Sequence, residues 1–298
     1  PDWLLAKLQR QYGEEELLAL AQSLQQSAPL DLRVNLHKTE REAVLSRLAA
    51  EGIAARATPY SPVGVRLEDK PQINRHPLFL EGAIEIQDEG SQLLCQLLAP
   101  RRGEMVADFC AGAGGKTMAL GAMMRGSGRL YAFDISEKRL AALKPRLARS
   151  GLSNVHPQWI ASENDARLKR LAGKLDRVLV DAPCTGLGTL RRNPDLKWRQ
   201  DEETLSERRA KQDVILAAAA KLVKPGGLML YATCSLLDEE NTQVVESFLA
   251  THAQFELRPA NAALAQQRIE LDTGEYLRLA PHLHGTDGFF AALLAKKI

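Results

Sequence analysis

Val106-Ala-Asp-Phe-Cys-Ala-Gly-Ala-Gly-Gly-Lys-Thr117 decides the fold of this chain. It has the pattern of a short apolar strand that enters a glycine-rich turn and then a helix over residues 116–125. Gly112, Gly114 and Gly115 have no Cβ, so backbone amides there can approach a ligand closely, and the positive end of the helix faces the same place. The stretch therefore predicts a nucleotide-binding turn.

Three kinds of ligand suit such a turn. A P-loop for ATP or GTP requires its first glycine at the position of Cys110, and a dinucleotide-binding turn requires its third glycine at the position of Thr117. An adenosyl ligand remains, because Asp134 ends the next apolar run about 20 residues after the glycines, where a carboxylate can bind both ribose hydroxyls. S-adenosylmethionine has those hydroxyls and no phosphate. The pattern favours it over the alternative, a plain tight turn followed by a solvent-facing acid.

The composition is that of an ordinary globular protein, with 45% hydrophobic and 26% charged residues in a length of 298. No apolar run approaches the ~20 residues of a membrane span and no signal peptide is visible, so we expect a cytoplasmic monomer with no membrane partner. The chain opens at Pro1 rather than at a methionine, so we expect a further segment upstream. A net charge of +2 is too small to predict nucleic-acid binding by itself.

The cysteines indicate neither a metal site nor disulfides. They lie far apart, with no C-x-x-C pair, at Cys95, Cys110, Cys184 and Cys234. We therefore expect reduced thiols and no bound metal.

The first part of the chain is expected to form a helical segment over 1–27 and a small α+β domain over 28–85. The pattern predicts a helix over 1–26, a strand over 30–36 and a strand over 64–67. Between the strands, a helix over 39–51 is expected to begin at a capping box made by Thr39 and Glu42. A catalytic domain is expected over 86–298.

From about residue 104 the chain alternates apolar strands with amphipathic helices, which is typical of an α/β fold whose parallel sheet is covered on both faces. The expected strands cover 104–109, 129–134, 154–159, 175–181 and 227–233, with a late pair at 254–258 and 288–295, and the expected helices cover 136–150, 165–172, 204–222 and 238–251. Ligands of such sheets bind at the carboxyl ends of the strands, near the point where the strand order reverses. The side chains expected there are Cys110, Asp134, Asp165, Asp181 and Cys234.

Two thiols and an acid follow neighbouring strand ends. Asp181-Ala-Pro-Cys184 follows one expected strand, and Cys234 follows another. A single cysteine is more often a small buried apolar residue, but two of them beside an acid at an adenosyl site favour catalysis. C5 of a pyrimidine is a methyl acceptor that requires a thiol, because it has no lone pair until a thiolate adds to C6. Asp181 is placed to protonate or hydrogen-bond N3 during that addition.

These motifs, over nearly the whole chain, resemble those of the Sun (Fmu-like) family of RNA cytosine-5 methyltransferases. The matching pieces are Leu32-Arg-Val-Asn35, Gln87-Asp-Glu-Gly-Ser-Gln92, residues 108–117, Asp134, Asn164-Asp-Ala166, Asp181-Ala-Pro-Cys184, Arg191-Arg-Asn-Pro-Asp195 with Trp198, Val223-Lys-Pro-Gly-Gly227, Thr233-Cys-Ser235 and Gly285-Thr-Asp-Gly-Phe-Phe-Ala291. The resemblance implies the Rossmann-like α/β sheet of the S-adenosylmethionine-dependent methyltransferases, flanked by helices and preceded by a small α+β, RNA-recognition-like domain.

The resemblance also assigns the two thiols. It implies that Cys234 attacks C6 and that Cys184 assists release of the methylated RNA. Spacing alone leaves these roles open, because DNA cytosine-5 methyltransferases use the cysteine of the Pro-Cys motif as the nucleophile.

The cofactor implied by the resemblance is S-adenosylmethionine, which leaves as S-adenosylhomocysteine. The residues expected to contact it are Cys110, Ala111, Gly112, Ala113, Gly114, Gly115, Lys116, Asp134, Arg139, Asp165 and Asp181, with Lys116 near the methionine end. The turn departs from the commoner family form Ala-Ala-Pro-Gly-Gly-Lys. Here Ala111-Gly-Ala-Gly-Gly-Lys116 has glycine for an alanine and alanine for the proline, which loosens the turn.

Contact with RNA has to come from basic clusters, because neutralised phosphates supply most non-specific affinity. The cluster just beyond the Pro-Cys motif is expected to make it: Arg191, Arg192, Lys197 and Arg199. Two further basic clusters are candidates, Arg101-Arg102 and Arg208-Arg209 with Lys211, but the pair Arg208-Arg209 is expected to be a solvated helix surface. Residues 28–85 lack an aromatic signature for base stacking, so they are expected to clamp RNA by shape and backbone.

The leading substrate is 16S ribosomal RNA. Transfer RNA, DNA methylation and a non-catalytic RNA-binding or assembly factor remain as alternatives.

Overall fold

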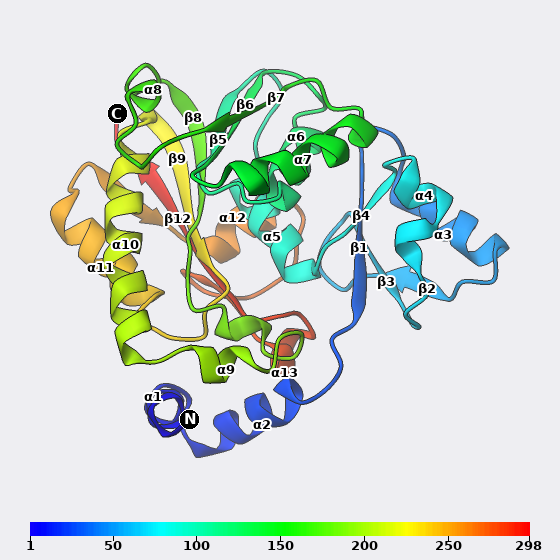
Figure 1. Ribbon diagram of the computed structural model, residues 1–298, viewed down its shortest axis with the longest axis horizontal. Helices are drawn as coiled ribbons and strands as arrows, with labels where there is room; N and C mark the ends of the chain where they lie inside the picture. The colour runs from blue at the N-terminus through cyan, green and yellow to red at the C-terminus, as the bar shows by residue number, and fades with distance from the viewer.

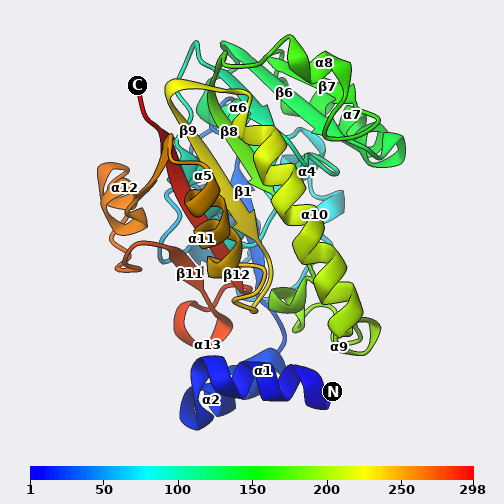
Figure 2. The same ribbon diagram turned by 90° about the vertical axis from the view of Figure 1, so that its left-hand side faces the viewer.

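The computed structural model describes residues 1–298, which form an N-terminal pair of helices, a four-stranded sheet and an eight-stranded sheet (Figure 1). The small sheet and its helices lie to one side of the large sheet, and the N-terminal helices lie across one end of the molecule (Figures 1 and 2). The expected fold class, a helix-flanked α/β sheet preceded by a small α+β domain, is confirmed. No helix combines the length and the apolar character needed to cross a membrane.

The N-terminal segment is a pair of helices rather than the single helix expected over 1–26. Helix α1 (Asp2–Tyr12) ends at Gly13, and α2 (Glu14–Leu24) begins directly after it. Gly13 has a φ of 77°, a left-handed conformation that glycine adopts without steric cost, so the chain changes direction there. Both helices pack against the large domain in a cluster made of Leu4, Leu8, Leu20, Leu187, Leu190, Leu205, Leu236 and Leu237.

The small sheet is antiparallel and has the order β2-β3-β1-β4. Its elements are β1 (Leu30–Val34), α3 (Arg41–Ala50), β2 (Ala55–Ala57), β3 (Gly64–Leu67), the 3-10 turn η1 (Ile73–Arg75), α4 (Pro77–Leu80) and β4 (Ile84–Ile86). The sequence predicts β1 and β3 but not the three-residue strands β2 and β4, which are too short to show a period.

The expected capping box at the start of α3 is wrong. Lys38 and Thr39 donate their backbone N–H groups to the carbonyl of Asn35, which forms a turn after β1. The helix therefore begins only at Arg41, and its N-cap is Glu40, whose side chain makes no capping hydrogen bond.

The large sheet has the order β10-β12-β9-β8-β5-β6-β7, with β11 paired to β12. Its parallel strands are β5 (Met105–Asp108), β6 (Arg129–Asp134), β7 (Val155–Trp159), β8 (Leu175–Asp181) and β9 (Val223–Thr233), and its antiparallel strands are β10 (Phe255–Arg258), β11 (Leu277–Leu279) and β12 (Phe289–Lys296). Every strand expected after residue 104 is present. β9 starts earlier than expected, at Val223, because its first residues pair with β8 across a register shift.

Helices cover both faces of this sheet, as expected. One face packs against α5 (Glu89–Leu98), α6 (Gly115–Met123), α7 (Glu137–Ser150) and α12 (Ala260–Gln266), and the other against α8 (Ala166–Lys169), α10 (Glu202–Ala220) and α11 (Thr242–Thr251). The short helices α9 (Leu196–Arg199) and α13 (Pro281–His284) lie in loops at one end (Figure 1). The 3-10 helix η2 (Leu187–Thr189) precedes α9 in the chain.

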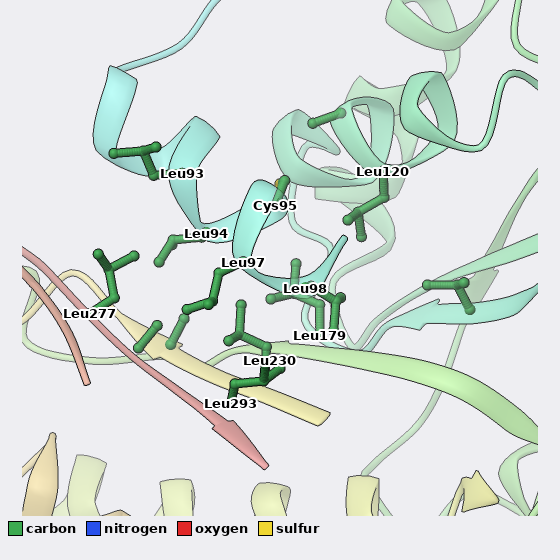
Figure 3. Packing of buried hydrophobic residues seen from close by; sticks show 14 of the residues in the cluster. Leu93, Leu94, Cys95, Leu97, Leu98, Leu120, Leu179, Leu230, Leu277 and Leu293 are labelled. Carbon is green, nitrogen blue, oxygen red and sulfur yellow. The ribbon is translucent and has the colours of Figure 1, made fainter. Parts of the chain in front are cut away.

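Helix α5 is the one long helix that the sequence pattern misses. All ten of its residues are buried, because its polar side, which includes Glu89 and Gln92, hydrogen-bonds to the small domain rather than facing solvent. Figure 3 shows its leucines, Leu93, Leu94, Leu97 and Leu98, packed against side chains of the large sheet.

The strand order reverses between β5 and β8. From β5 the chain proceeds through β6 and β7 on one side, and then returns to β8 and β9 on the other. Loops that leave the carboxyl ends of β5 and β8 therefore diverge, and the crevice between them is where open α/β sheets bind ligands.

Candidate active site

A cavity of about 460 Å³ lies at this reversal point, within the size range of small-molecule sites. It is lined by Gln87, Ser91, Asp108, Phe109, Cys110, Ala111, Gly112, Ala113, Gly115, Lys116, Asp134, Ile135, Arg139, Ile160, Glu163, Asp181, Ala182, Pro183, Cys184, Arg208, Lys211, Ile215 and Cys234. The structure thus brings together both candidate catalytic thiols, Asp181 and nearly all of the residues expected to contact a cofactor.

The glycine-rich turn is held by the acid at the end of β6. Asp134 accepts hydrogen bonds from the N–H of Gly112 (2.8 Å) and of Ser136 (2.7 Å). A Cβ placed on Gly112 would meet nothing within 4 Å, so this part of the turn faces open space. The carboxylate and the backbone of the turn therefore border the same part of the cavity.

Gly114 does not line the cavity, although it was expected to contact the cofactor. Its φ is 83°, and a Cβ on it would lie 2.1 Å from Cδ1 of Leu143 in α7. A side chain is excluded at this position by the packing of α7 and by the backbone conformation. Gly114 thus supports the turn on the side that packs against α7, away from the cavity.

Asp165 also lies outside the cavity lining. Its carboxylate caps α8 by accepting from the N–H of Arg167 (2.9 Å), and it accepts from the N–H of Ala161 (2.9 Å). These hydrogen bonds lower the pKa of Asp165. Ile160 and Glu163, on the same loop, take its place in the cavity wall.

Lys116 and Asp181 form an ion pair inside the cavity, with Nζ 2.6 Å from Oδ2. Burial lowers the pKa of Lys116, but the Asp181 carboxylate outweighs burial and leaves that pKa raised. The pair joins the first turn of α6 to the end of β8 and supplies a proton donor beside an acceptor.

The two thiols expected from the sequence meet at the cavity. Cys184 follows β8, Cys234 follows β9, and their sulfurs are 3.5 Å apart. The hydrogen bond to Cys234, burial, and the nearby Glu240 raise the pKa of Cys184 well above its ordinary value. Cys184 is therefore held as a thiol beside Cys234.

A buried carboxylate fixes the loop that carries Cys184. Glu240, which is 0% exposed, accepts from the N–H of Thr185 (2.9 Å), from its hydroxyl (2.6 Å) and from Nε2 of Gln212 (3.0 Å). The same Nε2 donates to the carbonyl of Pro183 (3.0 Å). This network was not expected from the sequence, because its members lie in separate elements.

The small domain also supports the glycine-rich turn. Arg33 of β1 is buried and donates to the carbonyl of Gly115 (2.7 Å) and to Oε1 of Gln87 (2.6 Å). Burial lowers its pKa to about 10. Gln87 lines the cavity, so one arginine connects the small sheet to the cavity wall.

Asp108, at the end of β5, is a cavity residue to which the sequence motifs assign no role. One of its oxygens accepts from the hydroxyl of Thr117 (2.7 Å), and the other is buried without a hydrogen-bond partner. Burial raises the pKa of Asp108 to about 7.

The arginines expected to contact RNA are already engaged within the protein. Arg191 and Arg192 share the carboxylates of Asp88 and Asp287, with Nε to carboxylate distances of 2.6 Å to Asp287. The side chain of Arg191 is only 6% exposed, so it has no surface for a phosphate. Arg191 therefore connects Asp88 and Asp287 inside the protein.

The rest of the expected basic cluster remains at the surface. Lys197 and Arg199 lie on α9 on either side of Trp198, whose side chain is 70% exposed. Lys197 lies over the Trp198 ring, with Nζ 5.7 Å from its centroid, and Arg199 pairs with Asp195.

The chain matches two protein-family models and is similar to curated proteins. A family model described as 16S rRNA methyltransferase RsmB/F matches residues 95–295, and one for the RsmF/B-like ferredoxin-like domain matches residues 1–74. The chain is 37% identical to the probable ribosomal RNA small subunit methyltransferase B of Synechocystis sp. over 297 residues, which covers 99% of this chain and 66% of that protein. It thus spans about two thirds of the length of the curated relatives it matches.

Two solved structures have the same fold over nearly the whole chain. The crystal structure of PH0851 is 34% identical with a TM-score of 0.88, and the match covers 99% of this chain and 66% of that one. A methyltransferase homolog from Pyrococcus horikoshii is 30% identical with a TM-score of 0.85, covering 99% of this chain and 95% of that one.

Proposed function

The chain belongs to the 16S rRNA methyltransferase RsmB/F family, which confirms the resemblance drawn from its motifs, and on that premise we propose that it methylates C5 of a cytosine in 16S ribosomal RNA. S-adenosylmethionine is the proposed methyl donor. The observation that carries the proposal is the pair of thiols 3.5 Å apart in a cavity that also contains the Lys116–Asp181 ion pair.

The residues of the cavity fit the adenosyl donor. The open space beside Gly112 would admit it, the Asp134 carboxylate would accept from its ribose hydroxyls, and Phe109, Ile135 and Ile160 supply apolar wall for the adenine. Its sulfonium group supplies an electrophilic methyl group.

The protein's own chemistry begins at Cys234. Its thiolate adds to C6 of the cytosine, a C–S bond forms, and N3 takes up a proton. Lys116 and Asp181, hydrogen-bonded to each other, provide the source of that proton. C5 then accepts the methyl group and a base takes the C5 proton. The C–S bond breaks as N3 returns its proton to the Lys116–Asp181 pair, which leaves 5-methylcytosine and Cys234 as a thiolate.

The pKa of Cys184 supports a later role for this residue. Two of the effects that raise it come from Cys234, through the hydrogen bond and through its charge. Once the Cys234 sulfur is bound to C6 it carries no charge, so both effects weaken and Cys184 becomes the more acidic. Burial and Glu240 still raise the pKa of Cys184, but the thiol loses its proton more readily after the adduct has formed than before, which suits a residue that resolves the adduct.

Trp198 and its neighbours form the proposed outer contact with RNA. An exposed tryptophan between two cations can stack a base while the cations approach phosphates. This assigns Lys197 and Arg199 to RNA binding, whereas Arg191 and Arg192 hold the protein together.

The test uses denaturing gels after incubation with labelled S-adenosylmethionine and unmodified 16S rRNA. We expect labelled RNA with the wild type, a slow, RNase-sensitive protein–RNA band with Cys184→Ala, and neither with Cys234→Ala. The double variant Cys184→Ala/Cys234→Ala is the matched control and should lose the band. A band only in Cys234→Ala would exchange the two roles.

Parallel incubations with transfer RNA and DNA identify the acceptor. Label in transfer RNA alone would replace the substrate, and label in no nucleic acid would refute methyl transfer.

A further inference from the structure

Two cations in the cavity wall have no partner in the protein. Arg208 and Lys211 of α10 line the cavity together with Ile215, at the spacing that places residues on one side of a helix. Neither side chain takes part in an ion pair or hydrogen bond. Arg209, the next residue, pairs instead with Asp213 and donates to the carbonyl of Gln243 (3.1 Å).

The other cations around the site are engaged. Lys116 pairs with Asp181, and Arg139 lies 3.8 Å from Asp134. Arg208 and Lys211 therefore stand out as positive charges that border a cavity without compensation. Arg208 is half-buried and Lys211 is exposed, so both side chains reach solvent as well as the cavity.

The position of these cations indicates their ligand. The Gly112 turn, Asp134 and Arg139 border the part of the cavity assigned to the methyl donor. Arg208 and Lys211 come instead from α10, whose Gln212 bonds to the carbonyl of Pro183, the residue before Cys184. Lys211 also lies near Cys110, where its charge counteracts part of the rise in the pKa of that thiol. A cytosine must approach from the side of Cys184 for its C6 to reach Cys234.

We propose that Arg208 and Lys211 bind the phosphate groups that flank the target cytidine. This inference rests on the proposed function. A base that leaves its stack to enter the cavity brings its own 5′ and 3′ phosphates to the cavity mouth. Arginine and lysine neutralise phosphate there, arginine through two parallel hydrogen bonds. The contacts offset part of the free energy lost by unstacking, and they hold the base over Cys234.

The test measures how the affinity for unmodified 16S rRNA depends on salt. Each phosphate contact in single-stranded nucleic acid contributes a slope of about −0.7 to the plot of log K against log salt concentration. Arg208→Gln and Lys211→Gln should each reduce the slope by about 0.7, and the double variant by about 1.4. Lys221→Gln is the matched control, because Lys221 is an exposed lysine at the end of the same helix and outside the cavity.

Two further measurements separate the possible outcomes. Calorimetry with S-adenosylmethionine should give the wild-type affinity in all variants, which also shows that they are folded, and steady-state kinetics should show a raised KM for RNA. Loss of cofactor affinity with an unchanged salt slope would assign the cations to the methyl donor and overturn the inference. The same slope in the double variant as in Lys221→Gln would overturn it too, with the proposed function intact if the wild type methylates RNA. A wild type that neither binds nor methylates 16S rRNA would refute both.

Discussion

Removal of the Glu240 carboxylate should destabilise the loop that carries Cys184. In Glu240→Ala, the Thr185 N–H and one N–H of Gln212 lose their acceptor inside the protein. The Thr185 hydroxyl can turn to Ser235, 3.3 Å away. Each buried donor left without a partner costs about 1–3 kcal/mol, so two of them cost about 2–6 kcal/mol. That is a large part of the stability of an ordinary domain.

The assay is a urea titration of wild type, Glu240→Ala and Glu240→Gln, followed by tryptophan fluorescence. Glu240→Gln keeps one oxygen for the two N–H donors, and its amide can donate to the Thr185 hydroxyl, so most of the stability should return. Methyl transfer should follow the same order, because the network fixes the backbone beside Cys184. The reasoning is refuted if Glu240→Ala unfolds within about 0.5 kcal/mol of the wild type, the range of neutral surface substitutions.

Three other predictions concern the cofactor turn. Arg33→Ala removes the hydrogen bond to the Gly115 carbonyl, so we expect the calorimetric Kd for S-adenosylmethionine to rise about tenfold, or ~1.4 kcal/mol; an unchanged Kd would contradict a support role. Gly114→Ala would place a Cβ against Leu143 on a residue with left-handed backbone conformation, and should lower the free energy of unfolding, measured in urea, by about 1–3 kcal/mol; an unchanged free energy would show that the turn adapts. Burial raises the pKa of Asp108 from 3.8 to about 7, so the stability it contributes is fully present below pH 3.8 and is lost as the pH rises through 7. Asp108→Asn keeps a partner for Thr117, and its stability relative to wild type should increase from pH 4 to 8 by at most about 4 kcal/mol; a difference independent of pH would refute this.

The sequence predicts the large sheet well because its strands are buried on both faces. Such strands are short apolar runs between turn signals, and their carboxyl ends meet at one edge. This rule alone predicts that Cys184 and Cys234 lie at the same edge of the sheet, and their sulfurs are indeed 3.5 Å apart.

The sequence does not show which charged side chains pair with each other in the folded protein. Arg191 looks like a free cation in a basic cluster, but Asp287 and Asp88, which neutralise it, lie about a hundred residues away along the chain. The sequence likewise cannot show that Arg208 has no ion-pair partner, because this requires the positions of all neighbouring side chains. Asp165 is ambiguous in the sequence for a local reason: an aspartate at this position suits both the N-cap of α8 and the binding of a cofactor, and in the structure it caps the helix.

The hydrogen bond from Arg33 to Gly115 couples the position of the small domain to ligand binding at the glycine-rich turn. A hydrogen bond from the small sheet to the Gly115 carbonyl makes the position of one domain part of the other domain's ligand site. Any ligand that shifts the small domain therefore changes the affinity of the glycine-rich turn for its own ligand. By thermodynamic reciprocity, binding at the turn changes the affinity for the first ligand by the same factor. For a two-substrate enzyme this coupling means that whichever substrate binds first changes the affinity for the second.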